Sequence, residues 1–150
     1  MTDGPDEPTD VETQAPEDEQ ALAPTMAKTE EIDLQVEVLA VKPAELMAQP
    51  DGEPSAVVAL RVATARARQL ERQGAANALL PAASLDDAVR ADAAARRFLQ
   101  SAAERLGWSG RRLHRTLKVA RSIADLAGSD AVATVHVAEA LQLQRALPTS

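Results

Sequence analysis

The hydrophobic positions of the chain first follow a two-residue period and then change to helical spacing. Residues 32–38 alternate apolar and polar side chains and place Ile32, Leu34, Val36 and Val38 on one face. This period predicts a half-buried β-strand. No second strand of comparable quality follows. Because a lone strand leaves its backbone polar groups unpaired, it must either pair with a sheet edge on another chain or belong to a sheet whose other strands are absent here.

Beyond residue 54 the pattern predicts four helices. The first begins near the possible N-cap Ser55 and ends at Gly74, a residue type that commonly follows a helix. Its apolar positions are Leu60, Ala63, Ala67 and Leu70, while Arg61, Arg68 and Arg72 fall on another face. The other three are expected over 86–106 with a stop at Gly107, from the cap Ser109 to Leu126 or Ala127 before Gly128, and from the cap Thr134 through Val135 to about Leu147 before Pro148.

The third predicted helix combines an apolar side with a basic side. At 100° per residue, the apolar side is formed by Leu113, Leu117, Ala120, Ala124 and Ala127. The basic side carries Arg111, Arg112, Arg115 and Lys118. Cations in the N-terminal half of a helix oppose its macrodipole. They therefore favour an external anion, the phosphate of a nucleotide or of a nucleic-acid backbone. A solvated surface face is the alternative interpretation.

The charge is divided unequally along the chain. Residues 1–33 contain eleven acidic residues and one lysine, for a net charge of −10, and residues 34–150 have a net charge of +3. Residues 1–31 mix proline, acidic residues, threonine and glutamine with scattered apolar side chains. Such a segment buries too little surface to offset its ordering entropy, so we expect a disordered acidic tail.

Several functional classes are disfavoured by composition and motifs. The sequence has no cysteine, no phosphate-binding loop, no catalytic serine elbow and no apolar run long enough to span a bilayer, so a cytoplasmic protein with no membrane segment is expected. With Phe98 and Trp108 as its aromatic residues, it offers no base-stacking platform. Neither His114 nor His136 has a partner at metal-ligand spacing, so no metal site is predicted. We expect His114 to be a partly buried packing residue and His136 to make a surface hydrogen bond with Glu139.

Residues 105–128, RLGWSGRRLHRTLKVARSIADLAG, resemble the C-terminal helical domain of magnesium-chelatase-like AAA+ ATPases of the ComM type, which are associated with competence and DNA processing. Residues 135–142 resemble the closing helix of that domain, and residues 66–74 its opening helix. Residues 32–38 are similar to the last strand of the family's ATPase core. The resemblance covers residues 32–147 in order, and it accounts for a strand without neighbours.

The resemblance implies a role for the basic side of the third helix. In the family, an arginine at the position of Arg111 senses the nucleotide phosphates, with Arg112, Arg115 and Lys118 as supporting or DNA-facing cations. The family's arginine finger has no counterpart, because Glu31 occupies its position. Without that finger and the Walker A and Walker B elements, the chain should not hydrolyse ATP alone. The chain would contact ATP and Mg²⁺ only when they are bound by an AAA+ ATPase core or ring assembly.

The sequence thus predicts a mainly α fold, a small four-helix AAA+ lid-like bundle preceded by one short β-strand and a disordered acidic N-terminal tail. The expected organisation is an acidic tail over 1–31, a strand and linker from the edge of an AAA+ core over 32–54, and a helical lid domain over 55–147. We expect a truncated or stand-alone lid that presents Arg111 to an ATPase on another chain. The alternatives are a helical module that binds the DNA phosphate backbone and a non-functional gene fragment.

Overall fold

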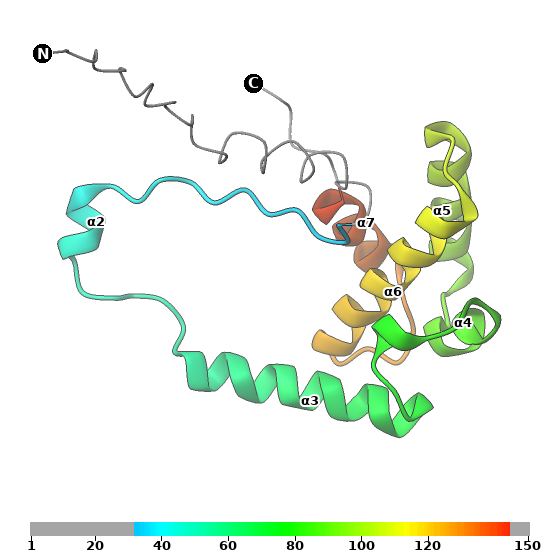
Figure 1. The fold of residues 1–150 in the computed structure, drawn as a ribbon, viewed down its shortest axis with the longest axis horizontal. Helices are drawn as coiled ribbons and strands as arrows, with labels where there is room; N and C mark the ends of the chain where they lie inside the picture. The colour runs from blue at the N-terminus through cyan, green and yellow to red at the C-terminus, as the bar shows by residue number, and fades with distance from the viewer. Residues whose placement is uncertain (1–31, 145–150) are drawn as a thin grey trace, which may run out of the picture. The chain divides into compact units, whose positions relative to one another are not determined.

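The computed structural model describes residues 32–144, which are mainly helical. The predicted acidic tail over 1–31 and the end of the last predicted helix, over 145–147, lie outside the described residues. Within them no helix is long and apolar enough to cross a bilayer. The elements are α2 (Pro43–Met47), α3 (Ser55–Gln73), the 3₁₀-helix η3 (Asn77–Leu79), α4 (Ala82–Val89), α5 (Ala93–Leu106), α6 (Gly110–Leu126) and α7 (Thr134–Leu143) (Figure 1).

Helix α6 is the central element of the helical body. It contacts α3, α4, η3 and α7, and α5 packs against α7 (Figure 1). The predicted apolar side of α6 is buried at Leu117, Ala120 and Ala124, but Ala127 is the exposed C-cap. The core that α6 shares with its neighbours consists of small and medium-sized aliphatic side chains, including Leu85, Val89, Ala95, Leu99, Val132, Val137 and Ala140.

The prediction of a β-strand over residues 32–38 is wrong. These residues form an irregular segment without a strand partner in the described part of the chain. A strand requires a ladder of backbone hydrogen bonds with a neighbour. Here the amide of Gln35 donates one backbone hydrogen bond, at 2.7 Å, to the carbonyl of Leu143 in α7. Apolar and polar residues do alternate over 32–38, but the end of α7 cannot provide the series of backbone hydrogen bonds that a β-strand requires.

The prediction of one helix over 86–106 is also wrong, because two helices, α4 and α5, occupy this region. Arg90 ends α4 in the left-handed conformation, with φ 49°, which a non-glycine residue seldom adopts. Its carbonyl accepts a hydrogen bond from the amide of Val132 at 3.2 Å, and the amide of Asp92 donates to the carbonyl of Val132 at 3.0 Å. Asp92 then caps α5 by accepting from the amide of Ala95 at 2.7 Å. The described residues therefore hold five α-helices after residue 54, rather than the four of the predicted bundle.

Helix α3 packs on the body with its arginine face. An amphipathic helix usually turns its apolar stripe toward the core, but Leu60, Ala63, Ala67 and Leu70 are all exposed, and Ala65 is the buried residue of the helix. Pro54 rather than Ser55 occupies the N-cap position, and Gly74 ends the helix with φ 73° as predicted. The hydrogen bonds from α3 to α6 join Arg72 to Asp125, which is one of two buried charged residues of α6.

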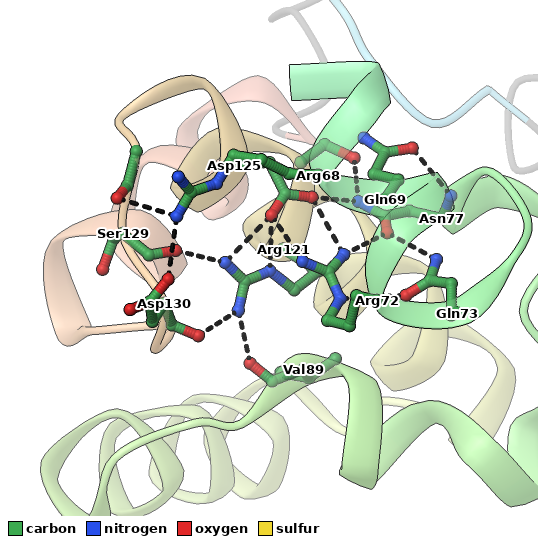
Figure 2. Close-up of polar contacts among 12 residues, drawn as sticks. Arg68, Gln69, Arg72, Gln73, Asn77, Val89, Arg121, Asp125, Ser129 and Asp130 are labelled. Atoms are coloured by element: carbon green, nitrogen blue, oxygen red, sulfur yellow. Dashed lines mark hydrogen bonds and ion pairs between the residues drawn. The ribbon is translucent and has the colours of Figure 1, made fainter. Parts of the chain in front are cut away.

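Arg121 and Asp125 of α6 are buried and joined one helical turn apart. The side chain of Arg121 has no exposed surface, and its Nη2 lies 3.0 Å from Asp125 Oδ1. Arg121 Nη1 donates to the carbonyls of Val89, at 3.0 Å, and Asp130, at 2.8 Å, and Nη2 donates to the carbonyl of Ser129 at 2.6 Å. The guanidinium thereby joins the end of α4 to the loop between α6 and α7 (Figure 2).

Asp125 also connects α3 and η3 to α6. Arg72 of α3 donates to both carboxylate oxygens, at 2.7 and 3.0 Å, and Asn77 Nδ2 donates to Oδ2 at 2.9 Å. A turn earlier in α3, Arg68 donates to the carbonyl of Gly128 at 2.9 Å and to Asp130 Oδ1 at 2.8 Å. Figure 2 shows these side chains converging from α3, η3 and the α6–α7 loop. One carboxylate thus organises contacts among three elements.

The pKa values of this pair follow from burial and from their partners. Burial by itself raises the pKa of Asp125, but hydrogen bonds from Arg72 and Asn77 and the charge of Arg121 outweigh burial, so the pKa is lowered. Burial lowers the pKa of Arg121, and the charge of Asp125 opposes that effect. Because an arginine begins from a very high pKa, Arg121 remains a cation. The network is therefore ionised.

We expect Asp125→Asn to lower the free energy of unfolding by about 3–5 kcal/mol, because it leaves the buried Arg121 and the largely buried Arg72 without their shared counter-charge. The matched control is Asp130→Asn, which removes a carboxylate that is 95% exposed from its pair with Arg68 and should cost less than about 1 kcal/mol. Urea unfolding followed by circular dichroism measures both. Equal losses in the two variants would contradict this role for Asp125.

We also expect the stability of the chain to fall in acid. Because folding lowers the pKa of Asp125, its contribution is fully present above the unfolded value of about 3.9 and is lost as the pH falls through the lower folded value. Urea midpoints measured from pH 6 to pH 2 should therefore decrease below about pH 4. Asp130→Asn should show the same decrease. A midpoint that stays constant across this range would contradict the assignment.

Candidate functional site

The candidate site is the start of α6, where a tight turn follows α5. Gly107 ends α5 in the left-handed conformation, with φ 61°, which glycine adopts without a Cβ penalty. Ser109 is the N-cap of α6, as predicted, and its Oγ accepts a hydrogen bond from the amide of Arg112 at 3.3 Å. The N-terminus of a helix carries partial positive charge and unpaired amides. The turn thus presents a favourable environment for an anion.

Arg111 and Arg112 lie in the first turn of α6, and both are exposed. The guanidinium of Arg112 lies over the Trp108 ring, 5.0 Å from its centroid, a cation–π contact that orients the arginine. Trp108 itself packs against the core. Within residues 32–144, the side chain of Arg111 has no hydrogen-bond or ion-pair partner. Of the two arginines, Arg111 is thus the more available to a ligand.

Arg115 and Lys118, farther along the same side, are already engaged by the chain. Arg115 Nε donates to Asp33 Oδ1 at 2.6 Å, and this ion pair connects α6 to the irregular segment that precedes α2. Lys118 Nζ donates to the carbonyl of Ala78 in η3 at 3.1 Å. The four cations predicted as one basic side therefore divide into an exposed pair at the helix N-terminus, Arg111 and Arg112, and a pair whose side chains donate hydrogen bonds within the chain, Arg115 and Lys118.

The sequence reasoning missed the charged residues inside the body. It placed Arg68 and Arg72 on the polar face of the first helix, and it assigned no role to Arg121 or Asp125. The i,i+4 spacing of Arg121 and Asp125 was a detectable signal for an ion pair. Their burial was not detectable, because it depends on carbonyls from α4 and the α6–α7 loop that are distant in sequence.

The two histidines are buried or partly buried in the helical body. His114 is partly buried, as expected. His136 is buried, and its Nδ1 accepts a hydrogen bond from the amide of Ala133 at 3.0 Å. The expected surface hydrogen bond with Glu139 is therefore wrong, because the ring of His136 turns back over the N-terminus of α7. Thr134, predicted as the cap, is the first residue of that helix and Ala133 holds the cap position.

The donor set at the start of α6 fits phosphate and does not fit a metal. Guanidinium groups and helix amides are phosphate ligands. Mg²⁺ requires carboxylate or other oxygen ligands, and among residues 32–144 no group of three or more histidine or acidic side chains is arranged to hold a metal. In a nucleotide complex these residues would hold phosphate oxygens, and any Mg²⁺ would need ligands from elsewhere.

Comparison with known proteins identifies a family and relatives for the helical region. The family model described as magnesium chelatase, subunit ChlI C-terminal, matches residues 52–144. The chain is 39% identical over 110 residues to the competence protein ComM of Haemophilus influenzae, covering 73% of this chain and 22% of that relative. It is also 39% identical over 90 residues to the protein YifB of Escherichia coli, covering 60% of this chain and 18% of YifB. The chain thus spans about a fifth of the length of these relatives.

The family match covers more than half of the chain, and it includes the helices α3 to α7 with the turn that presents Arg111. The relatives have the same region at 39% identity. The chain therefore belongs to the magnesium chelatase ChlI C-terminal family and contains a lid domain of the ComM type.

Proposed function

We propose that this chain supplies the helical lid of a magnesium-chelatase-like ATPase and that Arg111 contacts the phosphates of a nucleotide held by an ATPase core. The observation that carries the proposal is the position of Arg111, exposed in the first turn of α6 and without a polar partner among residues 32–144. Helix dipole, unpaired amides and guanidinium all favour an anion at this point.

Family membership supports the identity of the partner. The chain belongs to the C-terminal family of magnesium chelatase, and this membership supports our proposal that the partner is an AAA+ ATPase. The contacts of the four cations indicate which of them can bind a phosphate. Arg115 and Lys118 would have to give up contacts with Asp33 and Ala78 to reach a phosphate. Arg111 requires no such exchange, and Arg112 can support it while stacked on Trp108.

The chemistry of phosphoryl transfer determines which groups the ATPase core and the lid each have to supply. Hydrolysis of ATP needs a phosphate cradle, a Mg²⁺ ligand set and a residue that positions water. We propose that the core supplies all three and that the lid supplies a cation to the phosphates. The purified chain alone is then expected to show no ATPase activity above a buffer blank in a phosphate-release assay.

The proposal predicts that Arg111→Ala removes the effect of nucleotide on the association of lid and core. The measurement is isothermal titration calorimetry, in which the 150-residue chain is titrated into the ATPase core of a ComM relative. That core is prepared without its own C-terminal domain. The titration is run with and without a non-hydrolysable ATP analogue and Mg²⁺. Nucleotide should tighten association, and losing one charge-assisted contact should weaken the nucleotide-bound complex by about tenfold to a hundredfold.

The matched control is Arg97→Ala, which removes an exposed arginine from α5. It should leave the nucleotide effect unchanged. If the two variants behave alike, or if nucleotide has no effect on the unmodified chain, the role of Arg111 is refuted. A parallel titration with duplex DNA separates a nucleotide phosphate from a DNA backbone phosphate. DNA binding that weakens steeply with salt and is lost in Arg111→Ala would favour the backbone.

A further inference from the structure

The outward face of α3 is an apolar stripe that the helical body does not cover. Leu60 is 70% exposed and Leu70 45% exposed, and the alanines between them are also exposed. In the second half of the helix, the opposite face docks on the body through Ala65, Arg68 and Arg72. Leu60 and Leu70 are joined by exposed alanines on the same face, and contiguous exposed apolar side chains indicate an interaction surface. The stripe therefore needs an occupant from outside the described body.

The spacing of the stripe specifies the geometry of that occupant. Its members follow one another at intervals of four, three, four and three residues, and they are Ala56, Leu60, Ala63, Ala67 and Leu70. This is the a/d repeat of a coiled coil, in which a second helix packs along the seam. In the same register, Ala65 and Arg72 take the f position, which lies opposite the seam. The contacts of both residues with the body agree with this register.

The charges that flank the stripe select the partner. In this register Arg66 occupies a g position and Glu71 the next e position, five residues later, and both are exposed. In a parallel pair of helices, a g residue lies beside the following e residue of the other helix. Two copies of α3 side by side in parallel would therefore form two Arg66–Glu71 pairs related by symmetry. In an antiparallel pair, g residues lie beside g residues and e residues beside e residues, so Arg66 would not lie beside Glu71 of the other helix.

We infer that α3 forms a parallel, two-stranded coiled-coil interface between two copies of this chain, with the stripe from Ala56 to Leu70 as its seam. The alanines at the centre let the helices approach closely, and Leu60 and Leu70 fill the two ends. The body of each copy lies on the far side of its own α3, so the seam is open to a second helix. The interface is distinct from the start of α6 and does not rest on the nucleotide proposal.

Sedimentation velocity of the 150-residue chain over a concentration series tests this interface. A reversible dimer is expected, and Leu60→Gln should weaken it. The matched control is Leu79→Gln, which alters an exposed leucine of η3 away from the seam and should leave the dimer unchanged. Circular dichroism checks that both variants keep their helical content. A chain that stays monomeric up to about 1 mM, which would correspond to very weak association, would overturn the inference.

Charge exchange tests the pairing of Arg66 with Glu71. Arg66→Glu and Glu71→Arg should each weaken the homodimer by about tenfold, because both symmetric pairs become repulsive. An equimolar mixture of the two variants should recover the affinity of the unmodified chain, because each pair then joins opposite charges. A dimer that is insensitive to all three seam and flank substitutions would place the interface elsewhere and would refute the proposal.

The direction of the helices has its own measurement. The chain contains no cysteine, so Ala56→Cys introduces a unique thiol near one end of α3. In the parallel dimer the two thiols face each other and should form a disulfide on mild oxidation. In an antiparallel dimer they would lie on the order of 20 Å apart. A dimer that forms without this cross-link would overturn the parallel arrangement.

Discussion

The charge on Asp125 is the constraint on which the arrangement of the helices depends. The carboxylate lies within the protein and receives Arg121 from its own helix, Arg72 from α3 and the Asn77 amide from η3. A buried charge is tolerated only when it is paired and hydrogen-bonded. Each element that packs against α6 on this side therefore has to position a hydrogen-bond donor toward the Asp125 carboxylate. Apolar contacts between alanine, valine and leucine side chains elsewhere in the body constrain the orientation of the helices much less, because they have no directional requirement.

The same helix carries the candidate site at its other end. Arg111 is in the first turn of α6, and Asp125 is in the last. Between them, Leu117, Ala120 and Ala124 hold the helix in the core. A helix fixed in this way positions an exposed arginine without any further support for that side chain. The Ser109 cap and the stacked Trp108 then define the local backbone and the neighbouring cation.

Sequence reasoning predicted the elements that local signals define. The cap at Ser109, the glycine stops at Gly74 and Gly107 and the buried apolar residues of α6 follow from short patterns. The break at Arg90 could not be predicted, because a non-glycine residue takes the left-handed conformation and its backbone is satisfied by Val132, forty-two residues away. The stripe of α3 was recognised, but its orientation was not, because the deciding partner of Arg72 is a buried carboxylate in another helix. At the candidate site, the cations were identifiable from spacing, whereas the engagement of Arg115 by Asp33 required the tertiary fold.

Helix α3 also has a mechanical property that follows from where it is held. Its polar contacts with the body come from Arg68 and the residues after it, and every residue from Ser55 to Thr64 is exposed. A helix of this length, 19 residues, extends roughly 28 Å at 1.5 Å per residue. The part from Ser55 to Arg68 extends roughly 20 Å, so a rotation of about 10° at Arg68 displaces the start of the helix by roughly 3.5 Å. A small rotation of α3 about its contacts with Asp125 and Asp130 would thereby become a displacement of roughly 3.5 Å at the start of the helix.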